Sequence, residues 1–411
     1  MPSDAPHAAR ALQSPENDTI PTFPFEFDGI SPPREYATRR TQCPLGKVHL
    51  VSGHDAVLVV KYDDVAAALA DPRLSHDLHA PGSPRFVTGP SHYDQPLPTM
   101  NSAKHRRYRR IVSPAFTSRS IERWKPAIEQ IAVELLDRIS QAGPPIDMAS
   151  GFCLEFPARV LCRILGIPDE DVQLLCRWSN AFVSSASLDA EERARLITEF
   201  SAYVWELVSR RRSDPGDALI DELITVRDSA DRLTDVEVVE WTMGLFAAGT
   251  ETTANSFGRF LLTLLGNGRE KWEELCAHPE LVPGAVDELL RLVCLSRFGQ
   301  LRMASEDVDL PSGRIEAGTA VVLSSNSAMR DENAYADAEE IRFDRGGPPL
   351  LAFGRAAHMC VGMNLAKAEL GIALRLLTDR FPTLDMDTTV GELAFSDGTL
   401  QSSLIAFPVT W

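Results

Sequence analysis

The chain has 411 residues, of which 44% are hydrophobic and 24% are charged, an ordinary globular composition with enough length to bury a substantial core. Its formal net charge of -17, from 41 Lys and Arg against 58 Asp and Glu, argues against general binding to nucleic acid or to anionic membranes. There is no apolar run long enough to predict a membrane span, and no Cys-x-x-Cys pair, so neither a disulfide framework nor a zinc ribbon is indicated.

The organisation of the chain follows from its composition. Residues 1–22 are polar and lack the apolar segment of a signal peptide, so we expect a disordered leader and a cytoplasmic protein. Residues 23–411 show no linker-like break and are predicted to form a single domain. Within them, residues 49–71 predict two strands joined by a turn, followed by a helix. Residues 80–100 are rich in Pro, Gly, Ser and His and predict a long loop that is functional or mobile.

Helices dominate the sequence after this loop. Apolar residues recur at helical spacing in the segments 119–139, 168–183 and 190–211. Strand patterns return only in short pieces, at residues 307–310, 319–325 and 403–411. This arrangement predicts a mainly α fold with a minor β part.

The longest helix is predicted to begin at Thr234, which forms a capping-box pattern with Glu237, and to run to about Gly266. Because apolar residues lie nearly all round this helix, we expect it to cross the interior of the protein. A helix in that position would be covered on every side by other elements.

The middle of this helix has an unusual composition for an interior segment. Residues 247–253 read AAGTETT, in which Gly249 costs about 1 kcal/mol of helix stability relative to alanine. Glu251 is expensive to bury unless it has a partner. Thr252 on its own is explained by a hydroxyl group that bonds back to a carbonyl one turn earlier. The small residues, the acid and the threonine together favour a groove that holds proton-handling groups.

Two charged patterns admit both a structural and a functional interpretation. Glu288 and Arg291 lie three residues apart, which is commonly a solvated surface pair, although their apolar neighbours point to a buried pair. The basic run KHRRYRR, residues 104–110, is commonly a solvated helix face. Because His105 and Arg109 lie one turn apart within it, the run could instead bind carboxylates.

A lone cysteine stands where a small-residue loop becomes a helix. Cys360 lies in FGRAAHMCVG, residues 353–362, after an apolar stretch and before a helical pattern. A cysteine taken at random is most often a buried apolar residue. The position of Cys360 at this turn can therefore be interpreted only together with the other motifs.

These segments, in this order, resemble the cytochrome P450 family and specifically its soluble bacterial members. The resemblance covers nearly the whole chain, from about residue 23 to the C-terminus. Each motif alone is weak, and it is their joint order and spacing that carry the resemblance. The matching features are HxxxR at His105 and Arg109, AGTETT at 248–253, ELLR at 288–291, RMASEDVDL at 302–310 and FGxxxHxCxG at 353–362.

The resemblance implies the cytochrome P450 fold, with the long helix over a haem, and Cys360 as the axial thiolate ligand of haem b. It also implies O2 as cosubstrate, because thiolate ligation donates electron density that favours O–O cleavage. The helix that begins near Gly362 would stabilise the thiolate through its N–H groups and dipole. Phe353 would shield the sulfur from water, and Gly249 would be among the residues that contact the cofactor.

Further roles are implied for the charged and polar residues. Two haem carboxylates buried in a protein need cationic partners. Thr252 with Glu251 would be the acid–alcohol pair that supplies protons during oxygen activation. Glu288 and Arg291 would form a structural ion pair, with a third member near Arg345. The implied propionate-binding residues are His105, Arg109, Arg302 and His358.

One position departs from the family's usual pattern in the cysteine loop. Ala356 stands where a second glycine is common, so we expect its backbone φ to be negative. The departure removes neither a ligand nor a proton-handling group.

The expected activity is that of a haem-thiolate monooxygenase that inserts one oxygen atom from O2 into a small, mostly apolar organic molecule. A natural-product intermediate, free or tethered to a carrier protein, is the expected substrate. The alternatives are the same scaffold catalysing oxidative coupling or desaturation without oxygen insertion, and a non-enzymatic haem sensor. Residues expected to line the substrate pocket are Phe182, Phe246, Ala247, Leu295 and Leu400.

A separate electron donor is also expected. No GxGxxG nucleotide-binding pattern follows a strand and precedes a helix, so electrons should arrive from a ferredoxin and its reductase. A basic docking face on this otherwise acidic protein would suit such a partner. Its candidate residues are Lys104, Arg106, Arg107, Arg110 and Arg355.

Overall fold

The computed structural model describes residues 20–28, 30–78, 83–86, 103–183, 189–227, 233–396 and 401–411. Most of the loop expected at 80–100 lies outside these residues, as do residues 1–19 of the expected leader and Leu400. Strand β1 already begins at Thr22, where it pairs with β2.

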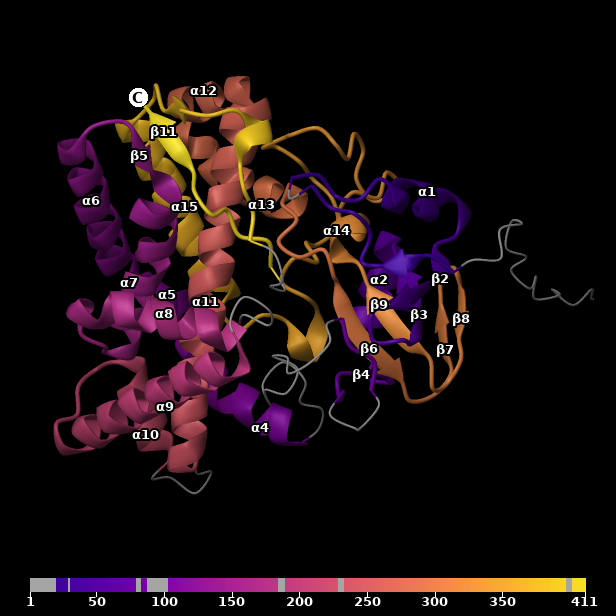
Figure 1. Ribbon diagram of the computed structural model, residues 1–411, viewed down its shortest axis with the longest axis horizontal. Helices are drawn as coiled ribbons and strands as arrows, with labels where there is room; N and C mark the ends of the chain where they lie inside the picture. Colours follow the sequence, from indigo (N-terminus) through magenta and orange to yellow (C-terminus); the bar gives the residue numbers. More distant parts are fainter. Residues whose placement is uncertain are drawn as a thin grey trace, which may run out of the picture.

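The described residues form a large helical part and a smaller sheet part that lie side by side (Figure 1). This arrangement confirms the expectation of a mainly α fold with a minor β part. The helices are α1 (Glu35–Gln42), α2 (Tyr62–Ala70), α4 (Ala103–Val112), α5 (Ser118–Glu122), α6 (Lys125–Ala142), α7 (Glu155–Leu165), α8 (Val172–Val183), α9 (Ala190–Ser213), α10 (Leu219–Arg227), α11 (Asp235–Leu262), α12 (Arg269–Ala277), α13 (Val282–Leu292), α14 (Ser325–Ala328) and α15 (Met363–Arg380).

The largest described sheet is mixed and has the strand order β1-β2-β3-β9-β6-β4. The predicted hairpin is confirmed, because β2 and β3 pair antiparallel and α2 follows them. Strands β3 and β9 pair in parallel although they are far apart in sequence. The strands are β1 (Thr22–Phe23), β2 (Leu45–Leu50), β3 (Asp55–Val59), β4 (Leu74–Ser75), β5 (Ile146–Asp147), β6 (Gln300–Ala304), β7 (Val308–Leu310), β8 (Gly313–Ile315), β9 (Ala320–Leu323), β10 (Asp385–Met386) and β11 (Pro408–Thr410).

Helix α11 is the predicted long helix, and it spans 28 residues through the middle of the helical part (Figure 1). The predicted capping box is present: the Glu237 N–H donates to the Thr234 hydroxyl, and the Thr234 N–H donates to the Glu237 carboxylate. Most of its side chains are buried because α7, α8 and α9 pack around it. The chain then continues as a π-helical turn, Thr263–Asn267.

One predicted helix is divided in the structure. The segment 119–139 forms α5 and then α6, with a break at Arg123 and Trp124. Pro126 explains the break, because it lies in the first turn of α6, where a residue without an N–H group is tolerated but cannot continue a preceding helix. Among the described residues, no helix is both long and apolar enough to cross a bilayer.

Candidate active site

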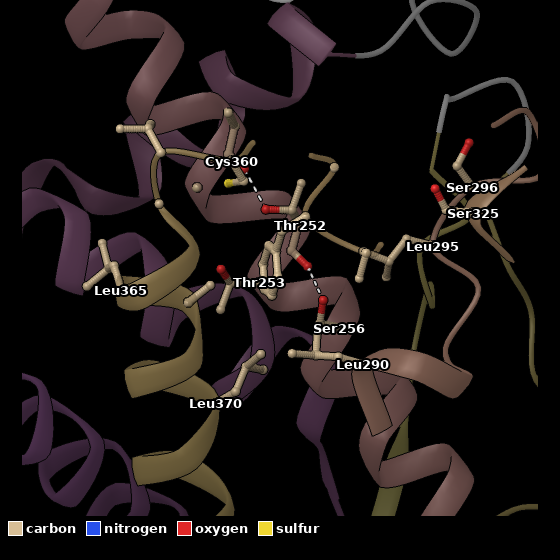
Figure 2. Close-up of a pocket in the computed structure, with 18 of the residues that line it drawn as sticks. Thr252, Thr253, Ser256, Leu290, Leu295, Ser296, Ser325, Cys360, Leu365 and Leu370 are labelled. Atoms are coloured by element: carbon tan, nitrogen blue, oxygen red, sulfur yellow. Dashed lines mark hydrogen bonds between the residues drawn. The ribbon is translucent and has the colours of Figure 1, made fainter. Parts of the chain in front are cut away.

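A cavity of about 580 Å³ lies between α11, the segment that follows α13, and the loop that leads into α15. Most of its lining side chains are apolar, such as Leu245, Leu290 and Leu365, with a few hydroxyl and amide groups among them. Figure 2 shows side chains of α11, such as Thr252, and of α15, such as Leu365 and Leu370, in this wall. A concave, mostly apolar space with few polar groups is typical of a site for a cofactor or small molecule.

Cys360 lines this cavity, and its side chain is accessible from it. The Cys360 N–H donates to the Phe353 carbonyl over 2.7 Å, which closes the loop before α15. Burial raises the pKa of the thiol, whereas the N–H groups of Gly362 and Met363 and the charge of Arg109 act to lower it. The sulfur therefore faces the donors that a thiolate needs, and a bound cation would complete its deprotonation. Phe353 also lines the cavity.

The backbone of this loop corrects one expectation. Ala356 has a φ of 54°, so the prediction of a negative angle is wrong. Gly354, two residues earlier, has a φ of 71°. The loop reverses direction between Phe353 and Cys360, which are joined by a hydrogen bond. This tight reversal places Gly354 and Ala356 in the left-handed region of φ. Alanine therefore holds a conformation that glycine adopts more readily.

The middle of α11 forms another part of the cavity wall. Gly249 and Thr252 both line the cavity. The Thr252 hydroxyl donates to the Ala248 carbonyl over 2.6 Å, the back-bond that sequence considerations favoured for an isolated threonine (Figure 2). A Cβ atom at Gly249 would come within 2.8 Å of Leu161 on α7, so this glycine also permits close packing between helices. The threonine is thus both back-bonded and exposed to the cavity.

Glu251 is partly buried and lies near Cys176 of α8. Burial raises the pKa of the Glu251 carboxyl to about 8. At neutral pH the group is therefore mostly protonated and able to give up a proton. Of the predicted acid–alcohol pair, Thr252 is among the residues that line the cavity and Glu251 is not.

Sequence considerations missed a buried acid that lines the cavity. Glu369 on α15 is 1% exposed and lines the cavity together with Thr253, with which it interacts. Burial raises the pKa of this carboxyl well above its usual value, and its Oε1 atom has no hydrogen-bond partner in the described structure. The signal available in the sequence was an acid on the apolar face of a predicted helix.

The predicted propionate-binding residues converge at one edge of the cavity. The His105 and His358 rings stack with centroids 4.0 Å apart, and His358 lines the cavity. Burial, followed by His105, Arg302 and Arg109, lowers the pKa of His358 to about 4. Burial and then the neighbouring arginines also lower the pKa of His105. Four groups from α4, β6 and the cysteine loop thus form a basic cluster that favours an anion.

The acid–arginine pair on α13 is buried rather than solvated. Glu288 and Arg291 are 2% and 1% exposed and share two hydrogen bonds of 2.8 Å and 2.9 Å. Arg345, the expected third member, donates to the same carboxylate. Burial acts to raise the pKa of the Glu288 carboxyl. The hydrogen bonds and charges of Arg291 and Arg345, together with the Arg342 N–H, outweigh burial, and the net result is a lowered pKa.

The residues expected to form the substrate pocket differ in their position relative to this cavity. Leu295 lines the cavity. Phe246 and Ala247 do not, because they point into the core, where Phe246 packs edge-on against Phe200. Their neighbours on α11 line the cavity instead. Helix geometry explains why neighbours differ, since successive residues are turned by about 100° around the axis, and the substrate-pocket role of Phe246 and Ala247 stays a prediction. The Phe182 side chain and Leu400 lie outside the described residues.

The residues of the cavity fit an iron porphyrin. A thiol faces the cavity at the start of α15, apolar side chains line the walls, and a basic cluster lies where two carboxylates would need partners. No set of three or more His, Cys, Asp or Glu side chains in the described part of the chain gathers as a metal site. A single thiolate ligand to a metal held by a macrocycle is consistent with that observation.

Comparison with known proteins identifies close similarities. A family model described as cytochrome P450 matches residues 261–400. The chain is 35% identical to mycinamicin IV hydroxylase/epoxidase of Micromonospora griseorubida, over 95% of this chain and 98% of that protein. It is 37% identical to nocardicin C N-oxygenase of Nocardia uniformis subsp. tsuyamanensis, over 92% of this chain and 94% of that protein.

Solved structures show the same similarity in three dimensions. The LnmA cytochrome P450 hydroxylase from the leinamycin biosynthetic pathway of Streptomyces atroolivaceus superposes with a TM-score of 0.89 at 34% identity, covering 95% of this chain and 100% of that one. SgvP, described as a putative thioether synthase in the tailoring of griseoviridin, also gives a TM-score of 0.89, at 32% identity and over 96% and 100% of the two chains.

Proposed function

Because this chain belongs to the cytochrome P450 family and is a monooxygenase of that family, we propose that it binds haem b through Cys360 and inserts oxygen into a mostly apolar small molecule. The observation that supports this proposal best is the accessible Cys360 thiol in one apolar cavity with Thr252. When bound, the haem supplies oxygen activation, which thiolate donation promotes. The side chains around the cavity supply the binding of the haem, the exclusion of water and the supply of protons.

Each group around the cavity has a physical task in this proposal. The basic cluster of His105, Arg109, Arg302 and His358 binds the haem carboxylates, whose burial would otherwise be costly. The apolar walls exclude water from the reacting centre. The Thr252 hydroxyl holds a proton at the cavity surface.

Glu251 is proposed to replenish the proton at Thr252. Its carboxyl is mostly protonated at neutral pH because of its raised pKa, and it lies on the α8 side of α11. The Thr252 hydroxyl donates to the Ala248 carbonyl, and rotation about its χ1 angle would release it for donation into the cavity. This step requires no movement of the backbone.

The substrate class follows from the lining and from the relatives. The wall is apolar apart from a few groups such as Ser296, Gln300 and Asn326, which suit a molecule with a small number of polar positions. The relatives named above act in natural-product pathways, on mycinamicin IV or nocardicin C for example. We propose a natural-product intermediate, either free or tethered to a carrier protein.

The electron donor is proposed to be a ferredoxin that docks on the face near α4 and the cysteine loop. Arg106, Arg110 and Arg355 are exposed there. Arg107 is removed from the expected set, because it forms an ion pair with Glu237 and is only 28% exposed. The Lys104 side chain is not described by the structure.

The cytoplasmic location of the protein stays a prediction.

The docking proposal is tested by reversing one charge. Arg106→Glu should slow electron transfer from the ferredoxin at low salt, and the difference from wild type should shrink as salt screens the interaction. Arg314→Glu, at an exposed position on the sheet part, is the control. Equal rates for Arg106→Glu and wild type at low salt would contradict the docking face.

The central test is spectroscopic. The haem-loaded protein, reduced under carbon monoxide, should show the red-shifted Soret band of thiolate ligation. Cys360→Ser should lose this band, whereas Cys276→Ser, at a partly buried cysteine of α12, should keep it. A wild-type protein that takes up haem without ever giving the band would refute the proposal.

A second candidate function is oxidative coupling without oxygen insertion. The similarity to SgvP, whose description is a putative thioether synthase, favours keeping this candidate. Turnover under ¹⁸O2 separates the two functions, because hydroxylation leaves one labelled atom in the product and coupling leaves none. The non-enzymatic sensor is not retained, because the relatives are named oxygenases and hydroxylases.

A further inference from the structure

Three imidazole rings form one stack at the edge of the cavity. The His358 ring lies between the rings of His76 and His105, with centroid distances of 3.5 Å and 4.0 Å and interplanar angles of 18° and 14°. The three residues come from separate parts of the chain: the segment after β4, the loop before Cys360, and α4. Sequence motifs accounted for two of these histidines, and His76 belongs to neither motif.

The sheet explains why His76 reaches this place. Strand β4 pairs antiparallel with β6, Leu74 with Ala304 and Ser75 with Met303. His76 directly follows β4, and Arg302, which the resemblance assigned to the basic cluster, directly precedes Met303 on β6. His76 is only 9% exposed, so most of its ring has been removed from water. The position of His76 after the edge strand β4 thus places a third imidazole in the same cluster.

The chemistry of the cluster suits carboxylates. Among the described residues, the ionisable side chains that act on His358 are all basic: His105, Arg302 and Arg109. Rings stacked face to face direct their nitrogen atoms outward along the edges of the stack, and the described residues contain no group arranged as a metal site. An array of N–H donors beside two guanidinium groups matches a ligand with adjacent carboxylates.

We propose that His76 is a third imidazole of the haem-propionate site, where it donates a ring N–H to a propionate beside His105 and His358. The inference rests on the haem binding proposed above. His76 would therefore help to hold the cofactor in place, in addition to fixing the orientation of the His358 ring by stacking. A hydrogen bond to a charged carboxylate contributes more than one between neutral groups, so its loss should be measurable.

The test measures the release of haem from the loaded protein to an excess of apomyoglobin. His76→Phe keeps a ring that can stack on His358 but has no N–H, and it should release haem about tenfold faster than wild type. His76→Gln keeps an N–H donor without the ring and should stay within about threefold of wild type. His278→Ala, which removes an exposed imidazole, is the control and should not change the rate.

The outcomes separate this inference from the function on which it rests. Release from His76→Phe at the wild-type rate would overturn the donor role, and so would release from His76→Gln as fast as from His76→Phe. Both results can be read only if the wild-type protein shows the thiolate spectrum. Absence of that spectrum from wild type would instead refute haem-thiolate ligation itself. A thermal melt of each variant with haem bound confirms that folding is retained.

Discussion

The Glu288 carboxylate accepts hydrogen bonds from Arg291 on its own helix and from Arg345, which lies 57 positions further along the chain. Arg291 also donates to the carbonyls of Met329 and Ala338, each over 2.7 Å. Every charged group in this network therefore has a partner, although the pair is almost fully buried. The network connects α13 to the segment that precedes the cysteine loop.

Removing one partner should be costly. Arg291→Ala leaves a buried carboxylate short of donors, so we expect a loss of about 3–5 kcal/mol in the free energy of unfolding, measured by urea titration. Arg314→Ala breaks a pair with Asp309 in which the two side chains are 59% and 70% exposed, so its loss of stability should be far smaller. Equal losses for the two variants would contradict the importance of the buried network.

Thr252→Ala should uncouple oxygen consumption from product formation. The variant removes the hydroxyl that faces the cavity, and we expect product formed per O2 consumed to fall at least about tenfold. Thr252→Ser keeps the hydroxyl and should retain most of the coupling. Full coupling in Thr252→Ala would exclude the proposed proton-donating role. Product and O2 consumption are measured in the same reaction, with purified electron donors.

The activity should depend on the protonation of Glu251. Its pKa is raised to about 8, so the proton is present at pH 7 and is lost as the pH rises through 8. We therefore expect coupling to decline between about pH 7 and 9. Glu251→Gln cannot exchange this proton, and its coupling should be lower at pH 7 and flat over the same range. A wild-type profile without this decline would contradict the assignment.

Glu369 should make stability depend on pH. Its folded-state pKa lies above the unfolded value, so its contribution is fully present below the unfolded pKa, about 4.3, and is lost as the pH rises. Glu369→Gln lacks this titration and should gain thermal stability relative to wild type between pH 5 and pH 8. Glu280→Gln, at a carboxyl that is 69% exposed, is the control. A constant difference in melting temperature would count against a buried, neutral Glu369.

The left-handed conformation of Ala356 also predicts how substitutions behave. Ala356→Gly relieves a backbone cost of about 1–2 kcal/mol but adds freedom to the unfolded chain, so stability should change by less than about 1 kcal/mol. Ala356→Val places a β-branched residue at positive φ and should destabilise the loop and speed the release of haem. Equal stability of the Ala356→Val and Ala356→Gly variants would contradict a positive φ at this position. Melting temperature and haem release are the measurements.

The sequence by itself determined the features that local patterns encode. The capping box at Thr234 was predicted correctly because it depends on residues close together in the chain. The tight loop before Cys360 was predicted for the same reason, but the positive φ of Ala356 within it was not. The order of the motifs was sufficient to indicate the family. Periodicity also gave the mainly helical class, since a buried helix face repeats within a few residues.

Tertiary structure decided what depends on segments that are distant in sequence. Only the packed chain shows Arg107 engaged by Glu237, Glu369 facing the cavity, and His76 stacked on His358. These contacts form where helices and strands that are distant in sequence pack together. The same packing determines how deeply each side chain is buried, and therefore its charge and pKa. A linear pattern carries no information about which remote side chain will lie against it.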